Sequence, residues 1–123
     1  MITIPSDLAR RAASLPSFAC DVRPARRAVV VAPSGELDMA TVPGVRDALT
    51  ELHEAGFAHL ILDLTAVDFL DSSGLALIAA ADRAATDDGR RFSLVLGAAR
   101  AVRRTLELSG LLGRLDVLPR SPA

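Results

Sequence analysis

Several residue types are absent or scarce in this chain of 123 residues, and each absence argues against a class of function. The sequence has no Lys, Asn, Gln, Trp or Tyr, so all 14 basic residues are arginines. Four Phe are the only aromatic residues, which nearly excludes base stacking on an aromatic platform. Cys20 is the only cysteine, which excludes an intrachain disulfide and a cysteine-based zinc cluster. Lys, Asn and Tyr have A/T-rich codons, and their absence indicates a GC-rich genome, most simply a bacterial one.

Charge and hydropathy exclude further classes. The 14 basic and 15 acidic side chains leave a net charge of −1, which gives no broad electrostatic reason to bind nucleic acid or an anionic membrane. The longest wholly apolar run, residues 75–81, is far shorter than the roughly 20 residues of a spanning helix. Residues 1–17 carry Asp7, Arg10 and Arg11 and do not resemble a signal peptide. We therefore expect a cytoplasmic protein.

Length and composition predict one globular domain with flanking segments. Half of the residues are hydrophobic and about a quarter are charged, as in ordinary folded domains. We expect the domain to span residues 18–118, with an N-terminal extension at 1–17 and a C-terminal tail at 119–123. In the extension, Ser6-Asp7 could cap a short helix with Leu8, Ala12 and Leu15 on one face, and a frayed tail is an equally supported alternative.

The pattern of apolar residues predicts alternating strands and helices. Pro33 lacks an N–H, so the strand containing Val29, Val30 and Val31 should end there or lie where no donor is needed. The order β-β-α-β-α-β-α, with a possible final strand, predicts an α/β fold with a small mixed sheet flanked by helices. The expected strands are 17–23, 29–31, 59–64 continuing loosely to 69–70, 92–96 and 115–118; the expected helices are 41–55, 75–85 and 99–108.

Two acidic turns lie where strands lead into helices, the usual place for a site in such sheets. They are Gly35-Glu36-Leu37-Asp38 and Asp71-Ser72-Ser73-Gly74. A serine at such a turn is most often a helix N-cap, because its hydroxyl can accept a free N–H of the first turn. The alternative is that an exposed hydroxyl there carries a phosphate, whose charge the helix N-terminus would stabilise.

Catalytic, metal and cofactor chemistry are poorly supported. The sequence has neither a GxxxxGK[ST] phosphate loop nor a GxGxxG motif. A hydrolase using Ser72 would need His53 or His59 beside it, but both histidines are expected at the opposite end of the sheet. Asp38, Asp68 and Asp71 could suggest a magnesium site, although turn and capping carboxylates are commoner. We expect no catalytic residue, no metal and no cofactor.

Three sequence blocks share their order and spacing with a known family. They are Gly35-Glu36-Leu37-Asp38 with Thr41; Leu62-Asp63-Leu64, Asp68-Phe69-Leu70 and Asp71-Ser72-Ser73-Gly74-Leu75; and Val102-Arg103-Arg104 with Leu108-Ser109-Gly110-Leu111. Together they resemble the signature of STAS domains, and above all that of the bacterial anti-sigma factor antagonists. The likeness covers about residues 28–118.

The resemblance implies a regulatory binding protein without catalytic activity of its own. Members of this family bind an anti-sigma factor that is also a serine kinase, and this binding frees the sigma factor. Phosphorylation of the antagonist releases the anti-sigma factor, and a serine phosphatase resets the cycle. By the position of the motif, the phosphorylated residue is Ser72, and Asp38, Asp71, Ser73 and Gly74 join it in partner binding. The free protein is expected to be a monomer.

Departures from the family pattern leave an alternative open. Pro33 stands where relatives usually carry a strand hydrophobe, and residues 1–17 have no obvious counterpart. STAS modules also serve other systems without a kinase, such as a lipid-transport ATPase complex. The alternative function is therefore an accessory module of a transporter or another signalling complex.

Overall fold

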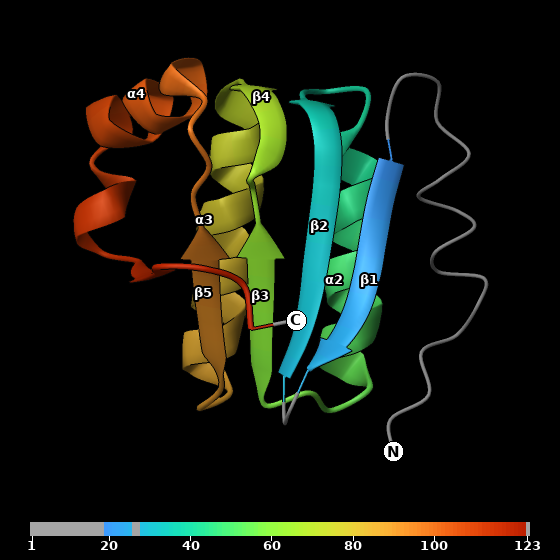
Figure 1. The fold of residues 1–123 in the computed structure, drawn as a ribbon. Coiled ribbons are helices and arrows are strands. Elements are labelled where there is room, and N and C mark those ends of the chain that lie inside the picture. Colours follow the sequence, from blue (N-terminus) through green and yellow to red (C-terminus); the bar gives the residue numbers. More distant parts are fainter. Residues whose placement is uncertain (1–18, 26–27, 123) are drawn as a thin grey trace.

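The computed structural model describes residues 19–25 and 28–122, so the predicted N-terminal extension lies outside the described residues. The described chain alternates strands and helices in the expected order, with one additional strand (Figure 1). The elements are β1 (Ala19–Ala25), β2 (Ala28–Leu37), α2 (Val42–Glu54), β3 (His59–Asp63), β4 (Ala66–Leu70), α3 (Ser72–Asp87), β5 (Arg91–Val95), α4 (Arg100–Ser109), the 3-10 turn η1 (Leu111–Gly113) and β6 (Asp116–Leu118).

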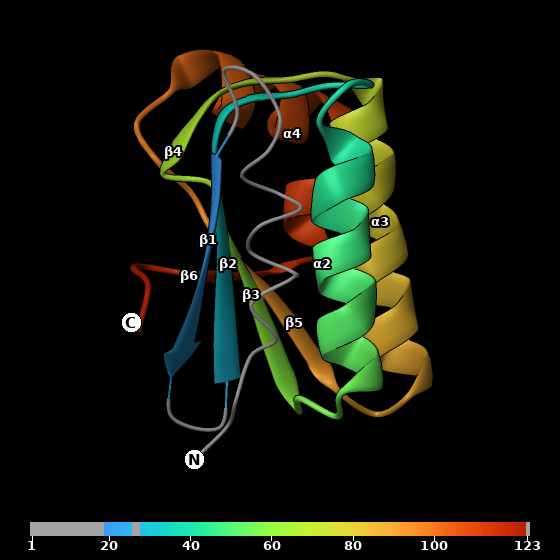
Figure 2. The same cartoon turned by 90° about the vertical axis from the view of Figure 1, so that its right-hand side faces the viewer.

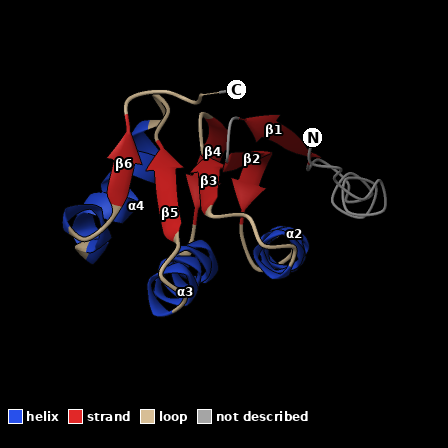
Figure 3. Cartoon of the chain, turned by 90° about the horizontal axis from the view of Figure 1, so that it is seen from below, coloured by secondary structure: helices blue, strands red, loops and turns tan. Residues whose placement is uncertain are grey.

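The strands form one mixed sheet in the order β1-β2-β3-β5-β6. β1 runs antiparallel to β2, and the pairs β2–β3, β3–β5 and β5–β6 are parallel. Helical crossovers between parallel strands place α2 and α3 on one side of the sheet, and α4 lies at the end of the sheet where it contacts β4, as Figures 2 and 3 show. The mixed α/β architecture predicted from the sequence is confirmed.

The segment after His59 is two strands rather than one loosely continued strand. β3 ends at Asp63, whose carboxylate accepts a hydrogen bond from the backbone N–H of Thr65 at 2.9 Å and so turns the chain out of the ladder. The chain then forms β4, which pairs in parallel with β2. β2 thus has β3 beside its first half and β4 beside its second half.

Pro33 lies inside β2 and does not end it. The pairing of β2 with β3 stops at Val31, and the pairing with β4 starts at Ser34. Pro33 therefore lies in the gap between these two pairings, where the edge of β2 that faces β3 and β4 has no strand beside it. The prediction that the strand ends at Pro33 is therefore wrong, and the alternative, that Pro33 lies where no N–H donor is needed, is confirmed. The ten-residue β2 passes through the proline.

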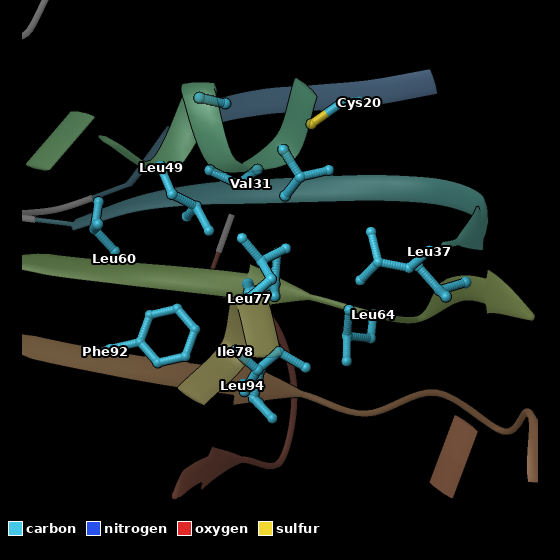
Figure 4. Close-up of a cluster of buried hydrophobic side chains, with 14 of the residues drawn as sticks. Cys20, Val31, Leu37, Leu49, Leu60, Leu64, Leu77, Ile78, Phe92 and Leu94 are labelled. Carbon is cyan, nitrogen blue, oxygen red and sulfur yellow. The ribbon is translucent and has the colours of Figure 1, made fainter. Parts of the chain in front are cut away.

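The main core lies between the sheet and its helices. Alternate strand residues such as Val31, Leu60 and Leu94 point toward α2 and α3 and are buried (Figure 4). The opposite face of the sheet carries no helix and has a smaller buried cluster of Ala28, Val30, Ile61 and Val95. Among the described residues, no helix combines the length and hydropathy needed to cross a bilayer.

Candidate functional site

The two acidic turns lie side by side at one end of the sheet. Leu37, at the end of β2, is paired in register with Leu70, at the end of β4. The backbone N–H of Asp71 donates to the carbonyl oxygen of Leu37 at 3.3 Å, which joins the two strand ends directly. The β2–β4 pairing therefore places residues 36–38 beside residues 71–74, although more than thirty residues separate them in the sequence.

Asp38 is fixed by hydrogen bonds within its own turn. Its Oδ1 accepts from the backbone N–H groups of Ala40 at 2.9 Å and Thr41 at 3.2 Å. The Thr41 hydroxyl donates to the carbonyl oxygen of Glu36 at 2.7 Å and accepts from the Asp38 N–H at 3.0 Å. Thr41 is buried and holds the turn that leads into α2. The half-buried Asp38 carboxylate is therefore held in place by the fold.

Asp71, and not Ser72, is the N-cap of α3. The Asp71 Oδ1 accepts from the backbone N–H groups of Ser73 at 2.8 Å and Gly74 at 3.2 Å. Ser72 is the first helical residue, its side chain is exposed, and its hydroxyl bonds to none of the residues that the structure describes. The expectation that the serine caps the helix is wrong, because the carboxylate one residue earlier already binds the free N–H groups.

Gly74 is required by the close packing of the helix start on both strand ends. A Cβ at this position would overlap the Leu70 side chain and approach the Leu37 carbonyl oxygen to 3.1 Å. Glycine lets the first turn of α3 lie directly on the ends of β2 and β4. Gly74 is buried and Ser73 half-buried, so within this turn Ser72 presents the exposed side chain. The structure thus brings Asp38, Asp71, Ser72, Ser73 and Gly74 together at one end.

The surroundings of Ser72 are acidic. Asp38 and Asp71 lie in the two turns. The exposed Glu36 and Asp68 lie in β2 and β4, the strands that lead into these turns. The ion pairs found among the described residues involve other acids, namely Asp63 with Arg23, Asp88 with His53, and Asp116 with Arg91. A further negative charge on Ser72 would therefore add to carboxylates that no arginine of the described chain neutralises.

Sequence reasoning did not identify two features of this end of the molecule. The first is the role of Thr41, which the sequence motif included without a function and which depends on its bonds to Glu36 and Asp38. The second is Met39, whose side chain is 77% exposed in the turn after Asp38. A single exposed apolar side chain is common on protein surfaces, so Met39 is notable for its place beside the acidic turn and not for its exposure alone.

The histidines lie far from Ser72. His53 Nε2 is 2.5 Å from Asp88 Oδ2, and Asp88 is the C-cap of α3. Because α3 is 16 residues long, this end is about 24 Å from Ser72. His59 begins β3, whereas Ser72 follows the end of β4. The structure therefore does not assemble a Ser-His-Asp site around Ser72.

The acids near Ser72 do not gather into a metal site. Within the described part of the chain, no group of three or more His, Cys, Asp or Glu side chains is placed to hold a metal ion. Asp38 and Asp71 each use one carboxylate oxygen to hold backbone N–H groups of their own turns. These carboxylates are capping and turn residues.

A mixed sheet with helices on one side, and an exposed serine after a capping aspartate, define the class of protein. The STAS domain family model matches residues 19–120, and the chain belongs to this family. The anti-sigma-B factor antagonist of Staphylococcus aureus is 31% identical over 83 residues, which cover 68% of this chain and 76% of that protein. A relative from Staphylococcus epidermidis with the same name is 28% identical over 83 residues.

Solved structures agree with this assignment. An anti-sigma factor antagonist from Mycobacterium paratuberculosis is 32% identical, with a TM-score of 0.74, covering 85% of this chain and 87% of that one. The antagonist SpoIIAA in its unphosphorylated form is 21% identical, with a TM-score of 0.65 over 84% of this chain and 90% of that one. The latter likeness shows a shared fold.

Proposed function

We propose that this protein is an anti-sigma factor antagonist that works by binding and is switched by phosphorylation of Ser72. The observation that carries the proposal is the exposed Ser72 hydroxyl, which has no hydrogen bond among the described residues and stands at the start of α3. Relatives named as anti-sigma factor antagonists support the same function. The unphosphorylated protein binds an anti-sigma factor with serine kinase activity and so releases the sigma factor.

The partner surface comprises Asp38, Asp71, Ser72, Ser73 and Gly74. These residues share one end of the sheet, and their backbone is fixed by the Asp38 and Asp71 turns. A partner that packs against Ser72 covers a rigid surface, so little conformational entropy is lost on binding. Met39 lies in the same region and adds exposed apolar area to it.

Phosphorylation would prevent this packing by charge. A phosphate adds about −1.5 to −2 charges at neutral pH. The N-terminus of α3 stabilises that charge in the free protein. A closely packed partner would have to bury the phosphate beside Asp71 and near Asp38, where desolvation and like-charge repulsion both oppose binding. Each tenfold loss of affinity needs about 1.4 kcal/mol. A serine phosphatase then restores the binding form.

This function needs no catalytic residue, metal or cofactor in the chain itself. The protein acts in the cytoplasm, as a monomer when free, and contacts neither nucleic acid nor membrane. Its net charge of −1 is consistent with a protein partner rather than a polyanion.

A capture experiment with four baits tests the proposal. Wild type, Ser72→Ala, Ser72→Asp and the control Ala84→Asp are immobilised and exposed to extract of the source cells. Ala84 is exposed on the same helix far from the site, so its substitution adds an equal charge elsewhere. We expect wild type, Ser72→Ala and Ala84→Asp to capture a protein with a serine kinase domain, and Ser72→Asp to lose it.

The captured protein is then incubated with ATP and the antagonist. Mass spectrometry should find phosphate on Ser72 of wild type and none on the Ser72→Ala protein. Capture of a transporter subunit by all four baits would replace this proposal with the accessory-module function. Equal capture of the kinase by Ser72→Asp would contradict the charge switch.

A further inference from the structure

The last described strand, β6, is attached to the sheet in part through one carboxylate. Asp116, in β6, accepts hydrogen bonds at Oδ2 from Arg91 Nε at 2.8 Å and from the Ser93 hydroxyl. Arg91 Nη2 is also 2.8 Å from this oxygen. The Ser93 oxygen in turn accepts from His59 Nε2, at 2.7 Å. Ser93 is fully buried, so a buried polar group on β5 receives the carboxylate.

Two residues later, Leu118 enters an apolar surface. Leu118 packs against the cluster of Val30, Ile61 and Val95 on the face of the sheet that has no helix. β6 pairs in parallel with β5 through Asp116, Val117 and Leu118, and Val117 points away and is exposed. In Figure 1 the chain after β6 crosses in front of β5 and β3 on this same face.

These contacts describe a binding site that the chain occupies with its own C-terminus. The site has three parts: a carboxylate receptor made by Arg91, Ser93 and His59, the backbone edge of β5, and the apolar floor of Val30, Ile61 and Val95. β6 is only three residues long and, among the described strands, pairs only with β5. A short edge strand is held weakly and opens more readily than a central one.

We infer that this site, here called the β6 site, binds extended peptide segments with an acidic residue two positions before an aliphatic one. The chain's own Asp116-Val117-Leu118 is the internal ligand. A partner segment of the same pattern would add to β5 as a parallel strand, with main-chain hydrogen bonds for affinity and the carboxylate receptor and apolar floor for specificity. It lies on the face opposite the helices and is separate from the Ser72 surface.

Competition between the internal strand and an added peptide tests this inference. The probe is a fluorescent peptide with the sequence of residues 114–122. It is titrated into the full chain, as wild type and as the double variant Asp116→Ala with Leu118→Ala. In this variant the internal strand lacks the side chains that bind the carboxylate receptor and the apolar floor. Because the internal strand reduces the fraction of open sites, the peptide should bind the double variant at least about tenfold more tightly than wild type.

Matched controls separate this site from general stickiness. A peptide with Asp116→Asn and Leu118→Ser should lose binding. In the double variant, Arg91→Ala should weaken binding of the original peptide, whereas Arg103→Ala, at an exposed arginine on α4, should not. Equal affinity for wild type and the double variant, or binding that Arg91→Ala leaves unchanged, would overturn the inference.

If the double variant does not fold, hydrogen exchange of the wild-type protein decides the question. The inference requires the amides of β6 to exchange through a local opening while those of Leu60, Ile61 and Leu62 in β3 stay protected. Exchange of β6 and β3 at one common rate would mean that β6 opens only with global unfolding, and the β6 site would then be rejected.

Discussion

Asp71 and Ser72 are neighbours in the sequence but have separate roles at the start of α3. The Asp71 carboxylate accepts hydrogen bonds from two backbone N–H groups. The Ser72 hydroxyl is exposed and forms no hydrogen bond with the described residues. This division lets Ser72 be modified without removing the helix cap. The residue proposed for regulation is thus one whose hydroxyl does not stabilise the described fold.

The two alanine variants at this turn should therefore differ in stability. Asp71→Ala leaves two N–H groups without their acceptor and should lower the free energy of unfolding by about 1 kcal/mol. Ser72→Ala removes no hydrogen bond and should change it by less than about 0.5 kcal/mol. Urea denaturation monitored by circular dichroism measures the free energy of unfolding of both variants. A larger loss for Ser72→Ala than for Asp71→Ala would show that the serine is the cap.

The sequence predicted which residues lie together at this end of the sheet, but not which of them caps the helix. The run Asp71-Ser72-Ser73-Gly74 after a strand indicates a turn into a helix whichever residue caps it. Aspartate and serine are comparably good N-caps, so residue type alone does not choose between them. The choice depends on backbone geometry, because only the extended φ and ψ of Asp71 place its carboxylate over the first turn.

At the scale of elements, β3, β5 and β6 are joined by polar groups on the helix-free face. Burial and the nearby Arg91 lower the pKa of His59 below its usual 6.5, and Asp116 offsets this only in part. The pKa of Asp116 is also lowered, chiefly by the Ser93 hydrogen bond and by Arg91. The network is therefore most stable with His59 neutral and Asp116 ionised.

This arrangement predicts a loss of stability in mild acid. Because the folded protein disfavours protonated His59, the unfolded chain binds more protons between the folded pKa and 6.5. The free energy of unfolding should thus fall as pH drops from neutral through 6.5. The contribution of Asp116 should be lost only at lower pH, below its unfolded value of 3.8.

The variant His59→Gln tests this assignment, because glutamine can still donate to Ser93 but does not titrate. Thermal unfolding of this variant should depend less on pH in the mildly acidic range than that of wild type. The control Thr105→Ala, which removes a non-titrating side chain on α4, should keep the wild-type dependence in this range. The same slope in wild type and His59→Gln would exclude His59 as its source.

Element prediction succeeded where the hydrophobic pattern was long and failed where pairing was non-local. The helix at 42–54 and the strand at 59–63 follow from apolar spacing within a single segment. β4 could not be separated from β3 in this way, because its existence depends on β2 as a partner and on the turn held by Asp63. Pro33 is tolerated for the same non-local reason, since β2 changes partners there.

On the scale of the whole molecule, the acidic end behaves as a surface on a rigid body. Ser72→Asp adds charge where α3 begins, and the favourable helix dipole and the unfavourable Asp71 act on it in opposite directions. We expect its melting temperature to lie within about 3 °C of wild type. Differential scanning fluorimetry measures this, with Gly74→Ala as a positive control that should melt clearly lower because a Cβ overlaps Leu70.

A drop of many degrees for Ser72→Asp would mean that phosphorylation acts by unfolding the turn and not by changing the surface. The proposed switch would then have to be described as a conformational change. A near-neutral result for Ser72→Asp, together with a large one for Gly74→Ala, separates the two cases within a single assay.

The parallel pairing of β2 with β4 also has a mechanical consequence. Ser72 directly follows β4, and β4 lies beside a strand in the middle of the sheet. A partner that pulls on Ser72 along the strand direction would load the hydrogen bonds between β4 and β2 together, in shear, instead of opening them one after another from an edge. The surface proposed to release its partner is therefore anchored by hydrogen bonds that would be loaded together.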